Sequence, residues 1–597
     1  MGGFLVWQPV GGGRGNAAPF EQAKAWLAAH KGLALSEENA GRALKLGRTN
    51  GSGAPLCSSS RGWLVTAGRW RHPDAGERSD ALLRLLETEG ASALDALDGN
   101  YALCWWDELS ATLLVELDPL GRLHLFVRET DGGTLLSTSS TAIAAAGGSE
   151  ADAQGVAEFL ACGNFYEERT PFVRVRRLRG GFRYRFRGGR APELEALPPV
   201  LGGAGVAPGR GATPEEVRGT LTRLVGSFHD GNSRPLCDLT GGYDSRLVLG
   251  LLLAAGVRPD VTVSGPPDSG DVRVARRLAD ALGLACHHVP AAGAAEAQAD
   301  FATVMRAARR AEGCYDAVEY AAIAHVHEWH SALPFDASVN GSGGEVFRNY
   351  WWDARDLARP GADALPLGVS RFARLARETP WLEPGAWAGP ERHFLGVVER
   401  SLARLPGRPI DESLDHLYLD LRMQCWQGAI ASATNQFWPS LSPLLLRASL
   451  ANVATIGPRP RLGASFLKRL LAGFGPVLRH QPLESGFPPL LLRPSNAWRH
   501  LPGLLKVPGR FRERLRQRSQ RARGGSAASE DLVRRLFASG AADYLRPATM
   551  ALRPLLRERE YEAFLGTARE SGRVPLATVG RLVALEFALR GARHSPN

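Results

Sequence analysis

Apolar and polar positions alternate over short segments in the first two hundred residues of the chain. Turn-forming residues separate these segments, which is typical of antiparallel sheets. Strands are therefore predicted at 62–67, 100–106, 112–117 and 123–127. Two intervening segments, 80–88 and 152–161, have the apolar spacing of helices that pack on a sheet.

The pattern changes after residues 202–209, which are rich in glycine and proline. Strands predicted at 235–239 and 261–264 then alternate with helices predicted at 214–229, 245–255 and 271–282. Such alternation predicts a parallel sheet covered on both faces, and from about residue 353 the signals are mostly helical. We predict two domains: 1–205, an antiparallel β-sandwich with flanking helices, and 206–597, an α/β parallel-sheet domain with a helical C-terminal part.

Composition places the chain among globular proteins, since 44% of its 597 residues are hydrophobic and 22% are charged. The net charge of +11 suits an anionic partner such as ATP, a nucleic acid or a membrane surface, without choosing among them. Seven cysteines stand singly with no C-x-x-C pair, which indicates reduced thiols and a cytoplasmic location. The longest apolar run, 247–257, is too short to span a bilayer, so we expect no membrane span.

The segment 237–246, C-D-L-T-G-G-Y-D-S-R, lies where a buried strand is predicted to turn into a helix. Thr240 and the two glycines after it leave the backbone N–H groups open to an anion such as pyrophosphate, and Ser245 can add a hydroxyl. Asp244 beside a bound triphosphate would suit Mg²⁺. A glycine pair alone would fit a plain tight turn equally well. The string is not the G-x-x-x-x-G-K-[ST] loop, so transfer of the terminal phosphate is not implied.

The full string resembles the S-G-G-x-D-S signature of the PP-loop ATP pyrophosphatases, with Thr240 for the first serine. Val263-Ser264-Gly265 ends the next predicted strand, and Asp271 then opens a helix. That order is similar to the synthetase domain of class B asparagine synthetase and its relatives. The resemblance implies ATP and Mg²⁺ as ligands.

A third block, 338–345, is similar to the family's G-x-G-[GS]-D loop, whose aspartate helps to hold magnesium. Here the carboxylate is Glu345, while a shift of one residue would place Gly344 at the aspartate position. The family's lysine–glycine pair is absent from 476–489, so the resemblance leaves the stabilising cation to Arg422, Arg479 or Lys468.

The resemblance therefore implies catalytic roles for Glu345 and Arg422, and Mg²⁺ on Asp244 and Glu345. The residues that it implies for ATP and pyrophosphate are Leu239, Thr240, Gly241, Gly242, Asp244, Ser245, Val263, Ser264, Gly341, Gly343 and Gly344.

The segments 97–102 and 117–122 resemble the Ntn-type glutaminase domain that precedes the synthetase domain in this family. In a working glutaminase, the residue after the initiator methionine is a cysteine that attacks glutamine, with its own α-amine as base. Gly2 and Gly3 stand here, and no cysteine precedes Cys57. We therefore expect an inactive front domain and an amine that arrives with the substrate.

Relatives with the same loss include β-lactam synthetases and lasso peptide cyclases. We expect an ATP-dependent, AMP-forming carbon–nitrogen ligase that activates a carboxylate as its adenylate. The first choice is macrolactam formation on a lasso-type precursor peptide in antibiotic biosynthesis, with a leader peptidase as a partner. Alternatives are asparagine-synthetase-like amidation or β-lactam-type closure of another small molecule or sugar. A non-catalytic scaffold is the other class of hypothesis, supported by the departures Tyr243, Arg246 and Glu345.

Two weaker signals remain. His325, His327, Glu328 and His330 do not follow the H-E-x-x-H order, and a zinc site is disfavoured. The arginine run from Arg510 to Arg523 would suit a peptide, lipid or nucleic acid, although such runs are usually solvated. Its few apolar residues make no stacking platform, so nucleic acid is not an expected partner.

Overall fold

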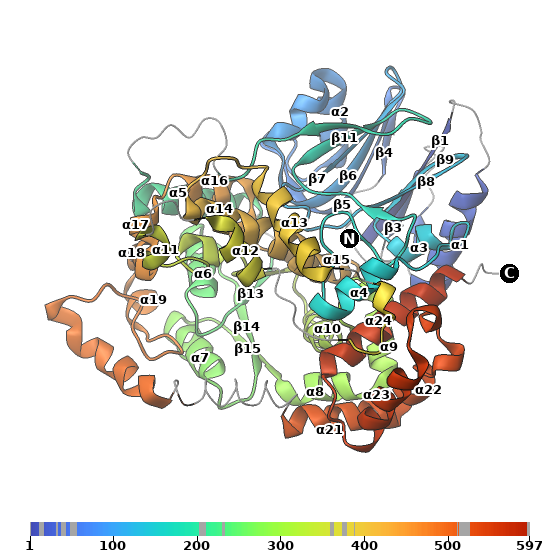
Figure 1. Ribbon diagram of the computed structural model, residues 1–597. Coiled ribbons are helices and arrows are strands. Elements are labelled where there is room, and N and C mark those ends of the chain that lie inside the picture. Colours follow the sequence, from blue (N-terminus) through green and yellow to red (C-terminus); the bar gives the residue numbers. More distant parts are fainter. Residues whose placement is uncertain are drawn as a thin grey trace.

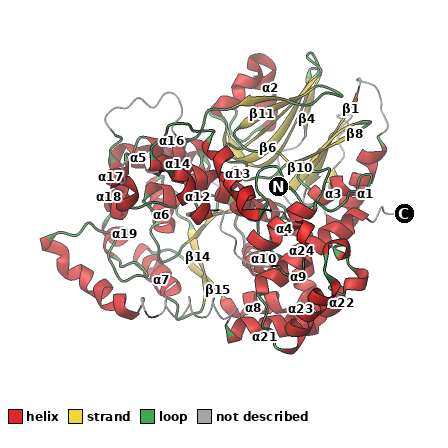
Figure 2. Cartoon of the chain, viewed as in Figure 1, coloured by secondary structure: helices red, strands yellow, loops and turns green. Residues whose placement is uncertain are grey.

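Two antiparallel sheets and one parallel sheet form the framework of the molecule (Figures 1 and 2). The computed structural model describes residues 2–10, 17–31, 34–36, 43–47, 56–201, 211–229, 233–358, 363–372, 379–386, 389–509, 512 and 526–593. The six-stranded antiparallel sheets have the orders β10-β8-β9-β1-β3-β2 and β12-β11-β7-β6-β5-β4, and the parallel sheet has the order β15-β14-β13-β16-β17. The predicted fold class is confirmed.

The strands have the following bounds: β1 Gly2–Pro9, β2 Ala34–Ser36, β3 Ala43–Gly47, β4 Cys57–Ser59, β5 Gly62–Arg71, β6 Asp98–Asp107, β7 Thr112–Leu117, β8 Phe126–Thr130, β9 Gly133–Ser137, β10 Arg176–Arg177, β11 Phe182–Phe186, β12 Glu193–Ala196, β13 Pro235–Asp238, β14 Asp260–Gly265, β15 Cys286–Pro290, β16 Ala337–Val339 and β17 Ser440–Leu441.

The helices have the following bounds: α1 Ala18–Lys31, α2 Ser79–Glu89, α3 Ser140–Ala145, α4 Ala153–Cys162, α5 Pro214–Ser227, α6 Asp244–Ala254, α7 Gly270–Leu282, α8 Ala291–Ala299, α9 Phe301–Ala311, α10 Ala317–Ser331, α11 Ala354–Ala358, α12 Ala364–Phe372, α13 Pro390–Leu402, α14 Ile410–Leu417, α15 Gly428–Asn435, α16 Arg447–Ala454, α17 Pro458–Arg461, α18 Ser465–Ala472, α19 Pro476–His480, α21 Ala527–Leu536, α22 Ala542–Tyr544, α23 Glu558–Glu570 and α24 Leu576–Arg593.

The two antiparallel sheets face each other across an apolar core. Phe4 and Val6 of β1 pack there with Val65 and Cys104 from the opposite sheet. Leu64, on the other face of β5, packs against α2. Because β5 and β6 are covered on both faces, their central residues, 63–67 and 101–106, are apolar apart from Thr66.

One predicted strand, 123–127, is displaced in the structure. β8 runs from Phe126 to Thr130 instead. The carboxylate of Asp118 accepts the backbone N–H groups of Leu120, Arg122 and Leu123 at 3.2, 3.0 and 3.2 Å. These bonds hold 118–123 in a turn. The apolar pattern therefore begins at residue 123, three residues before β8 begins to pair in the sheet.

In the parallel sheet, β13 pairs with β14 on one side and β16 on the other. Helix α6 follows β13, and α7 follows β14, as the alternating pattern predicted. After residue 353, β17 is the single strand in the described part of the chain. Within that part, no helix is long and apolar enough to cross a membrane.

The two predicted domains share a core and a polar junction. Trp26 and Ile143 lie in one apolar cluster with Val304 and Leu582. The division at 205 and 206 stays a prediction, since residues 202–210 lie outside the described part.

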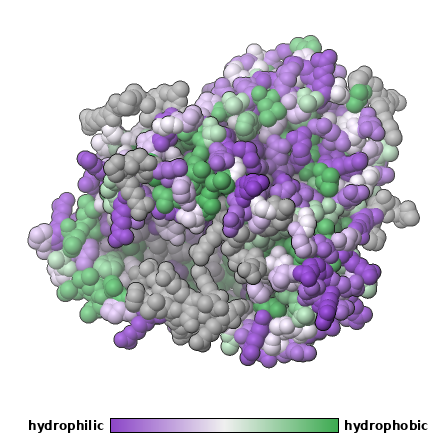
Figure 3. All heavy atoms as spheres, viewed as in Figure 1, coloured by the Kyte–Doolittle hydropathy of each residue, from purple (hydrophilic) through white to green (hydrophobic). Residues whose placement is uncertain are grey.

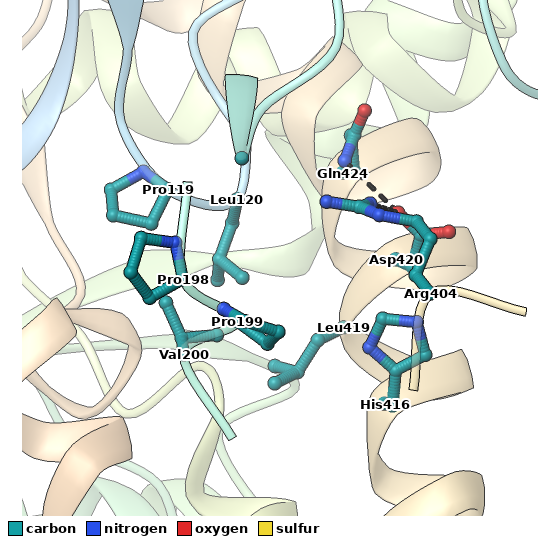
Figure 4. Close-up of a pocket in the computed structure, with 11 residues that line it drawn as sticks. Pro119, Leu120, Pro198, Pro199, Val200, Arg404, His416, Leu419, Asp420 and Gln424 are labelled. Atoms are coloured by element: carbon teal, nitrogen blue, oxygen red, sulfur yellow. Dashed lines mark hydrogen bonds and ion pairs between the residues drawn. The ribbon is translucent and has the colours of Figure 1, made fainter. Parts of the chain in front are cut away.

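At the junction, Asp420 accepts hydrogen bonds from Arg179 and Arg404 at 3.0 Å each (Figure 4 shows Arg404). The cavity beside them, about 30 Å³, has room for about one water molecule. It is too small for a substrate.

Candidate active site

The candidate site lies where the order of the parallel strands reverses. From β13 the chain proceeds outward to β14 and β15, and then continues on the other side as β16 and β17. The loops after β13 and β16 therefore leave neighbouring strands at the same edge of the sheet. A crevice at such a reversal is the usual ligand position in parallel α/β sheets.

Glycines allow these two loops to touch. A Cβ atom on Gly341 would lie 2.5 Å from the backbone nitrogen of Ser245. A Cβ atom on Gly344 would lie 2.5 Å from Cβ of Asp244, and closer still to its carboxyl group. Gly343 has φ +90° and packs against Leu445, which also leaves no room for a side chain. The structure thus brings the two predicted glycine-rich blocks together.

The amides of the first loop point at oxygen atoms. The Thr240 N–H donates to Oγ of Ser245 at 3.0 Å, and the Gly242 N–H donates to Oγ1 of Thr240 at 3.3 Å. The Gly241 N–H donates to Oδ1 of Asp271 at 2.7 Å. One of these three successive amides, that of Gly241, holds a carboxylate, and amides in series before a helix are the donor set that an anionic oxygen needs. Leu239, in contrast, is buried in the sheet core.

Asp244 is the first residue of α6, and its side chain is half-buried between the loops, with 19% of it exposed. Oδ2 accepts a hydrogen bond from Arg348 at 2.7 Å, while Oδ1 is buried and has no hydrogen-bond partner among the described residues. Burial raises the pKa of Asp244, the Arg348 guanidinium lowers it, and the negative charge of Glu345 raises it. An unpaired buried carboxylate oxygen is costly, and a cation would satisfy it.

Glu345 lies in the short helix η3, Gly344–Phe347, and Oε2 accepts the Tyr418 O–H at 2.8 Å. Asp244 and Glu345 are therefore the two carboxylates that could hold Mg²⁺ here. Among the described residues, no three His, Cys, Asp or Glu side chains group as a metal site. Two carboxylates nevertheless fit a magnesium ion that keeps its remaining bonds to phosphate and water.

Arg348 is the cation that the structure places against these carboxylates. It directly follows η3, with an extended backbone, and its guanidinium also lies 4.9 Å from the Tyr350 ring centroid. Neither Arg348 nor Tyr418 belongs to a sequence motif. The closeness of Arg348 to Glu345 in the sequence is the only signal that could have suggested a cation at this site.

Arg422 lies farther out. It belongs to the π-helix η5, Tyr418–Gln427, a type of helix that is frequent at functional sites. Its exposed guanidinium lies 4.4 Å from the ring centroid of Trp426, and no hydrogen bond to Asp244 or Glu345 occurs among the described residues. Its predicted catalytic role stays a prediction.

A segment from the C-terminal part closes over the first loop. Arg246 of α6 is buried and donates to the backbone oxygens of Leu478, Gln481 and Pro482. Burial lowers its pKa to about 10. The Glu484 N–H then donates to the Gly241 oxygen at 2.9 Å. Arg246 therefore anchors the wall of the site, which accounts for an arginine at this position.

Val263 and Ser264 lie just before Gly265, the last residue of the neighbouring strand β14, at the same edge as the first loop. Val263 is buried in the sheet core, and Ser264 is exposed. The contact from this region to the loop is made by Asp271 of α7, which was not among the predicted ligands.

A polar cavity of about 190 Å³ lies beside the ends of β13, β16 and β17. Asn100 and Arg122 line it from the front part of the chain, and Asp238 and Asn340 line it from the sheet. Oδ1 of Asp238 is buried without a hydrogen-bond partner among the described residues, and burial raises the pKa of Asp238 to about 7. This cavity has the size and polarity for one small polar group.

The weaker signals lie elsewhere. The His330 ring bonds the hydroxyls of Thr262 and Ser338 at 3.0 and 3.4 Å, as a buried structural histidine does. His327 lines the polar cavity. The arginine run from Arg510 to Arg523 falls outside the described residues, apart from Arg512, which is exposed.

Comparison with known proteins bears on the front part of the chain. Residues 74–193 match a glutamine amidotransferase domain. This amidotransferase domain contains both segments in which the sequence resembled a glutaminase, and it points to an enzyme with an amidotransferase-like role.

Two solved structures are similar over 49% of this chain, each at 12% identity and a TM-score of 0.23. One is described as the allosteric regulatory enzyme of purine biosynthesis, of which 80% is covered. The other is glutamine phosphoribosylpyrophosphate amidotransferase from B. subtilis complexed with ADP and GMP, of which 81% is covered. At these TM-scores the likenesses support no conclusion. No curated protein sequence matches the chain.

Proposed function

We propose that this chain is an ATP-dependent, AMP-forming carbon–nitrogen ligase. It would activate a substrate carboxylate as its adenylate, release pyrophosphate and pass the acyl group to an amine. The observation that carries the proposal is the meeting of two glycine-rich loops around Asp244, at the reversal of strand order. A buried carboxylate oxygen without a partner, beside backbone N–H donors, suits a nucleotide triphosphate with its metal ion.

Each residue of the site has a proposed task. The amides of Thr240, Gly241 and Gly242 would bind the pyrophosphate oxygens, in place of the Asp271 and hydroxyl oxygens that they now bond. Asp244 and Glu345 would hold Mg²⁺, which neutralises charge on the phosphates. Arg348 would supply a fixed positive charge beside them, the task that the family gives to a lysine.

The amine is proposed to arrive with the substrate rather than from glutamine. Strand β1 holds no cysteine, serine or threonine. A side chain at Gly3 would also collide with Thr138, because its Cβ atom would lie 2.9 Å from Cβ of that residue and closer to its hydroxyl. The amidotransferase domain would then serve as a wall of the substrate site, through Asn100 and Arg122.

The polar cavity is the proposed position of the amine. The free Oδ1 of Asp238 could accept a hydrogen bond from an ammonium or amino group. With a pKa of about 7, the same carboxyl could take up a proton near neutral pH, and an amine attacks only after it has lost one. The volume of about 190 Å³ would fit the end of a peptide or a single small molecule.

As the particular reaction we propose macrolactam formation on a lasso-type precursor peptide, in the cytoplasm and with a leader peptidase as partner. In that reaction one molecule brings both the carboxylate and the amine, which agrees with a β1 without a nucleophile. Amide formation on a small molecule would use the same site, and the choice of substrate separates the two.

Exchange of labelled pyrophosphate into ATP tests the ligase proposal. The protein is incubated with Mg-ATP and a panel of peptides and small carboxylates, beside the variants Asp244→Ala and Asp268→Ala. Asp268 is exposed in the loop before α7 and serves as the matched control. We expect exchange with the wild type and Asp268→Ala, and a loss of at least about hundredfold in Asp244→Ala. If no carboxylate gives exchange above the Asp244→Ala level, the proposal fails.

A further inference from the structure

The segment 492–507 concentrates exposed apolar side chains on one part of the surface. Twelve large hydrophobic residues are exposed in the described part of the chain, and half of them fall within this segment. They are Leu492, Trp498, Leu501, Leu504, Leu505 and Val507. Scattered single apolar residues are normal on a surface, but a contiguous group indicates an interaction site.

Three of these side chains, Trp498, Leu501 and Leu505, lie on one face of a helical segment. The helix η8, Pro494–His500, continues into residues 501–509, which are also helical. Trp498, Leu501 and Leu505 are three and four residues apart, so they share a face. On the opposite face, a Cβ atom on Gly503 would lie 2.5 Å from the Phe487 ring. The helix therefore packs against the protein with the face of Gly503 and exposes its apolar face to solvent.

The segment also projects from the body of the molecule. In Figure 1 it forms the orange end at the left of the view, beyond α19. Figure 3 shows hydrophobic and hydrophilic side chains next to each other at that end. Such a projection can reach a flat surface before the rest of the protein does.

Positive charge accompanies the apolar face. The segment itself carries Arg493, Arg499 and Lys506 and no acidic residue. Over residues 492–523 the sequence has ten basic residues and one acidic residue, a net charge of +9 in a chain whose total is +11. Almost the whole net charge of the protein thus lies in and directly after this segment.

The charge and the exposed side chains of the segment 492–507 favour one class of partner over the others. A second copy of the chain would bring a like charge against this segment, which disfavours self-association through it. A single exposed aromatic ring, Trp498, gives no platform for stacking bases. Leucine, valine and tryptophan beside lysine and arginine are the composition of helices that lie in the headgroup region of anionic membranes.

We propose that the segment 492–507 docks this protein on an anionic membrane surface. The apolar face would enter the boundary between headgroups and acyl chains, and the neighbouring cations would pair with lipid phosphates. This association is peripheral, and it is independent of the proposed ligase activity.

Sedimentation of the full-length protein with lipid vesicles tests the proposal. One set of vesicles contains phosphatidylglycerol and phosphatidylcholine, and the other contains phosphatidylcholine alone. The test variant is Leu505→Glu, at a side chain that is 81% exposed. The matched control is Leu109→Glu, the same change at a residue that is 75% exposed between β6 and β7. Because both residues are exposed, both variants should unfold at the wild-type temperature.

We expect the wild type and Leu109→Glu to bind the anionic vesicles equally, and to bind the neutral vesicles at least about tenfold more weakly. Leu505→Glu should bind the anionic vesicles about tenfold or more weakly, because it replaces an inserted apolar group with a charge. Three results would overturn the proposal: no binding to anionic vesicles, equal binding by both variants, or a wild-type dimer that Leu505→Glu converts to a monomer.

Discussion

Gly344→Ala is the sharpest test of how the two loops form the site. The new Cβ atom would lie 2.5 Å from Cβ of Asp244 and closer to the carboxyl carbon. Gly344 does not have a positive φ, so alanine is compatible with its backbone and the effect is steric alone. The methyl group would have to displace the carboxylate that we propose to hold the metal ion.

The size of the effect follows from these distances. The optimal separation of non-bonded carbon atoms is about 3.5 to 4.0 Å, so the two loops must move apart by about 1 Å to accommodate the methyl group. A displacement of about 1 Å at a catalytic group costs about a hundredfold in rate. Pyrophosphate exchange by Gly344→Ala should therefore fall by about a hundredfold. The packing strain should lower the free energy of unfolding by about 1 to 3 kcal/mol.

Gly457→Ala is the matched control, because a Cβ atom there would meet nothing within 4 Å and its φ is −60°. Both variants are assayed for exchange and for urea unfolding. Wild-type exchange by Gly344→Ala in a folded protein would refute the reasoning, since the loops could then not be as close as the structure has them, or Asp244 would have no role in exchange.

Three further predictions concern charged groups. In Arg348→Gln the pKa of Asp244 should rise further, because the Arg348 guanidinium lowers it. The acidic limb of the pH profile of pyrophosphate exchange should therefore move to higher pH, and Arg348→Lys should return the limb to its wild-type position. An acidic limb that does not move in Arg348→Gln would contradict this. Burial raises the pKa of Asp238 to about 7. The folded protein therefore keeps a proton that the unfolded chain releases above about pH 4. The stability that this group contributes is lost as the pH rises to 7. Asp238→Asn should therefore gain about 2 to 3 kcal/mol in free energy of unfolding relative to wild type between pH 5 and pH 8, measured with urea, and a constant difference would speak against it. Asp420→Asn leaves Arg179 and a second arginine without their buried anion, and should lower the free energy of unfolding by about 3 to 5 kcal/mol, again measured with urea. The control Asp80→Asn, at an exposed ion pair, should not lower it measurably. Equal losses in the two variants would mean that the junction does not depend on the Asp420 charge.

Local patterns predicted much of the fold. The alternation of strand and helix after residue 211 located β13, α6, β14 and α7 to within a few residues, because these strands are buried on both faces and bounded by turn residues. The misplaced strand at 123–127 shows the limit of periodicity. There a single side chain, Asp118, bonds three amides and keeps apolar residues out of the sheet.

The candidate site was predictable in part for a similar reason. The segment 240–245 can be recognised in the sequence by its glycines between a strand and a helix. The parallel pairing of β13 with β16 then places 341–344 beside it. The Arg348 contact and the Asp238 cavity depend on segments far apart in the sequence, and no local pattern reveals them. The tasks of all these residues stay predictions until activity is measured.

The measurement that tests the central claim most directly is the fate of oxygen from the substrate carboxylate. A carboxylate substrate labelled with ¹⁸O is incubated with the protein, Mg-ATP and the amine, and the nucleotide products are examined by mass spectrometry. If the chain activates its substrate as an adenylate, one labelled oxygen appears in AMP for each amide formed, and pyrophosphate is released unlabelled. Labelled inorganic phosphate together with ADP, or amide formation without label in AMP, would contradict the account.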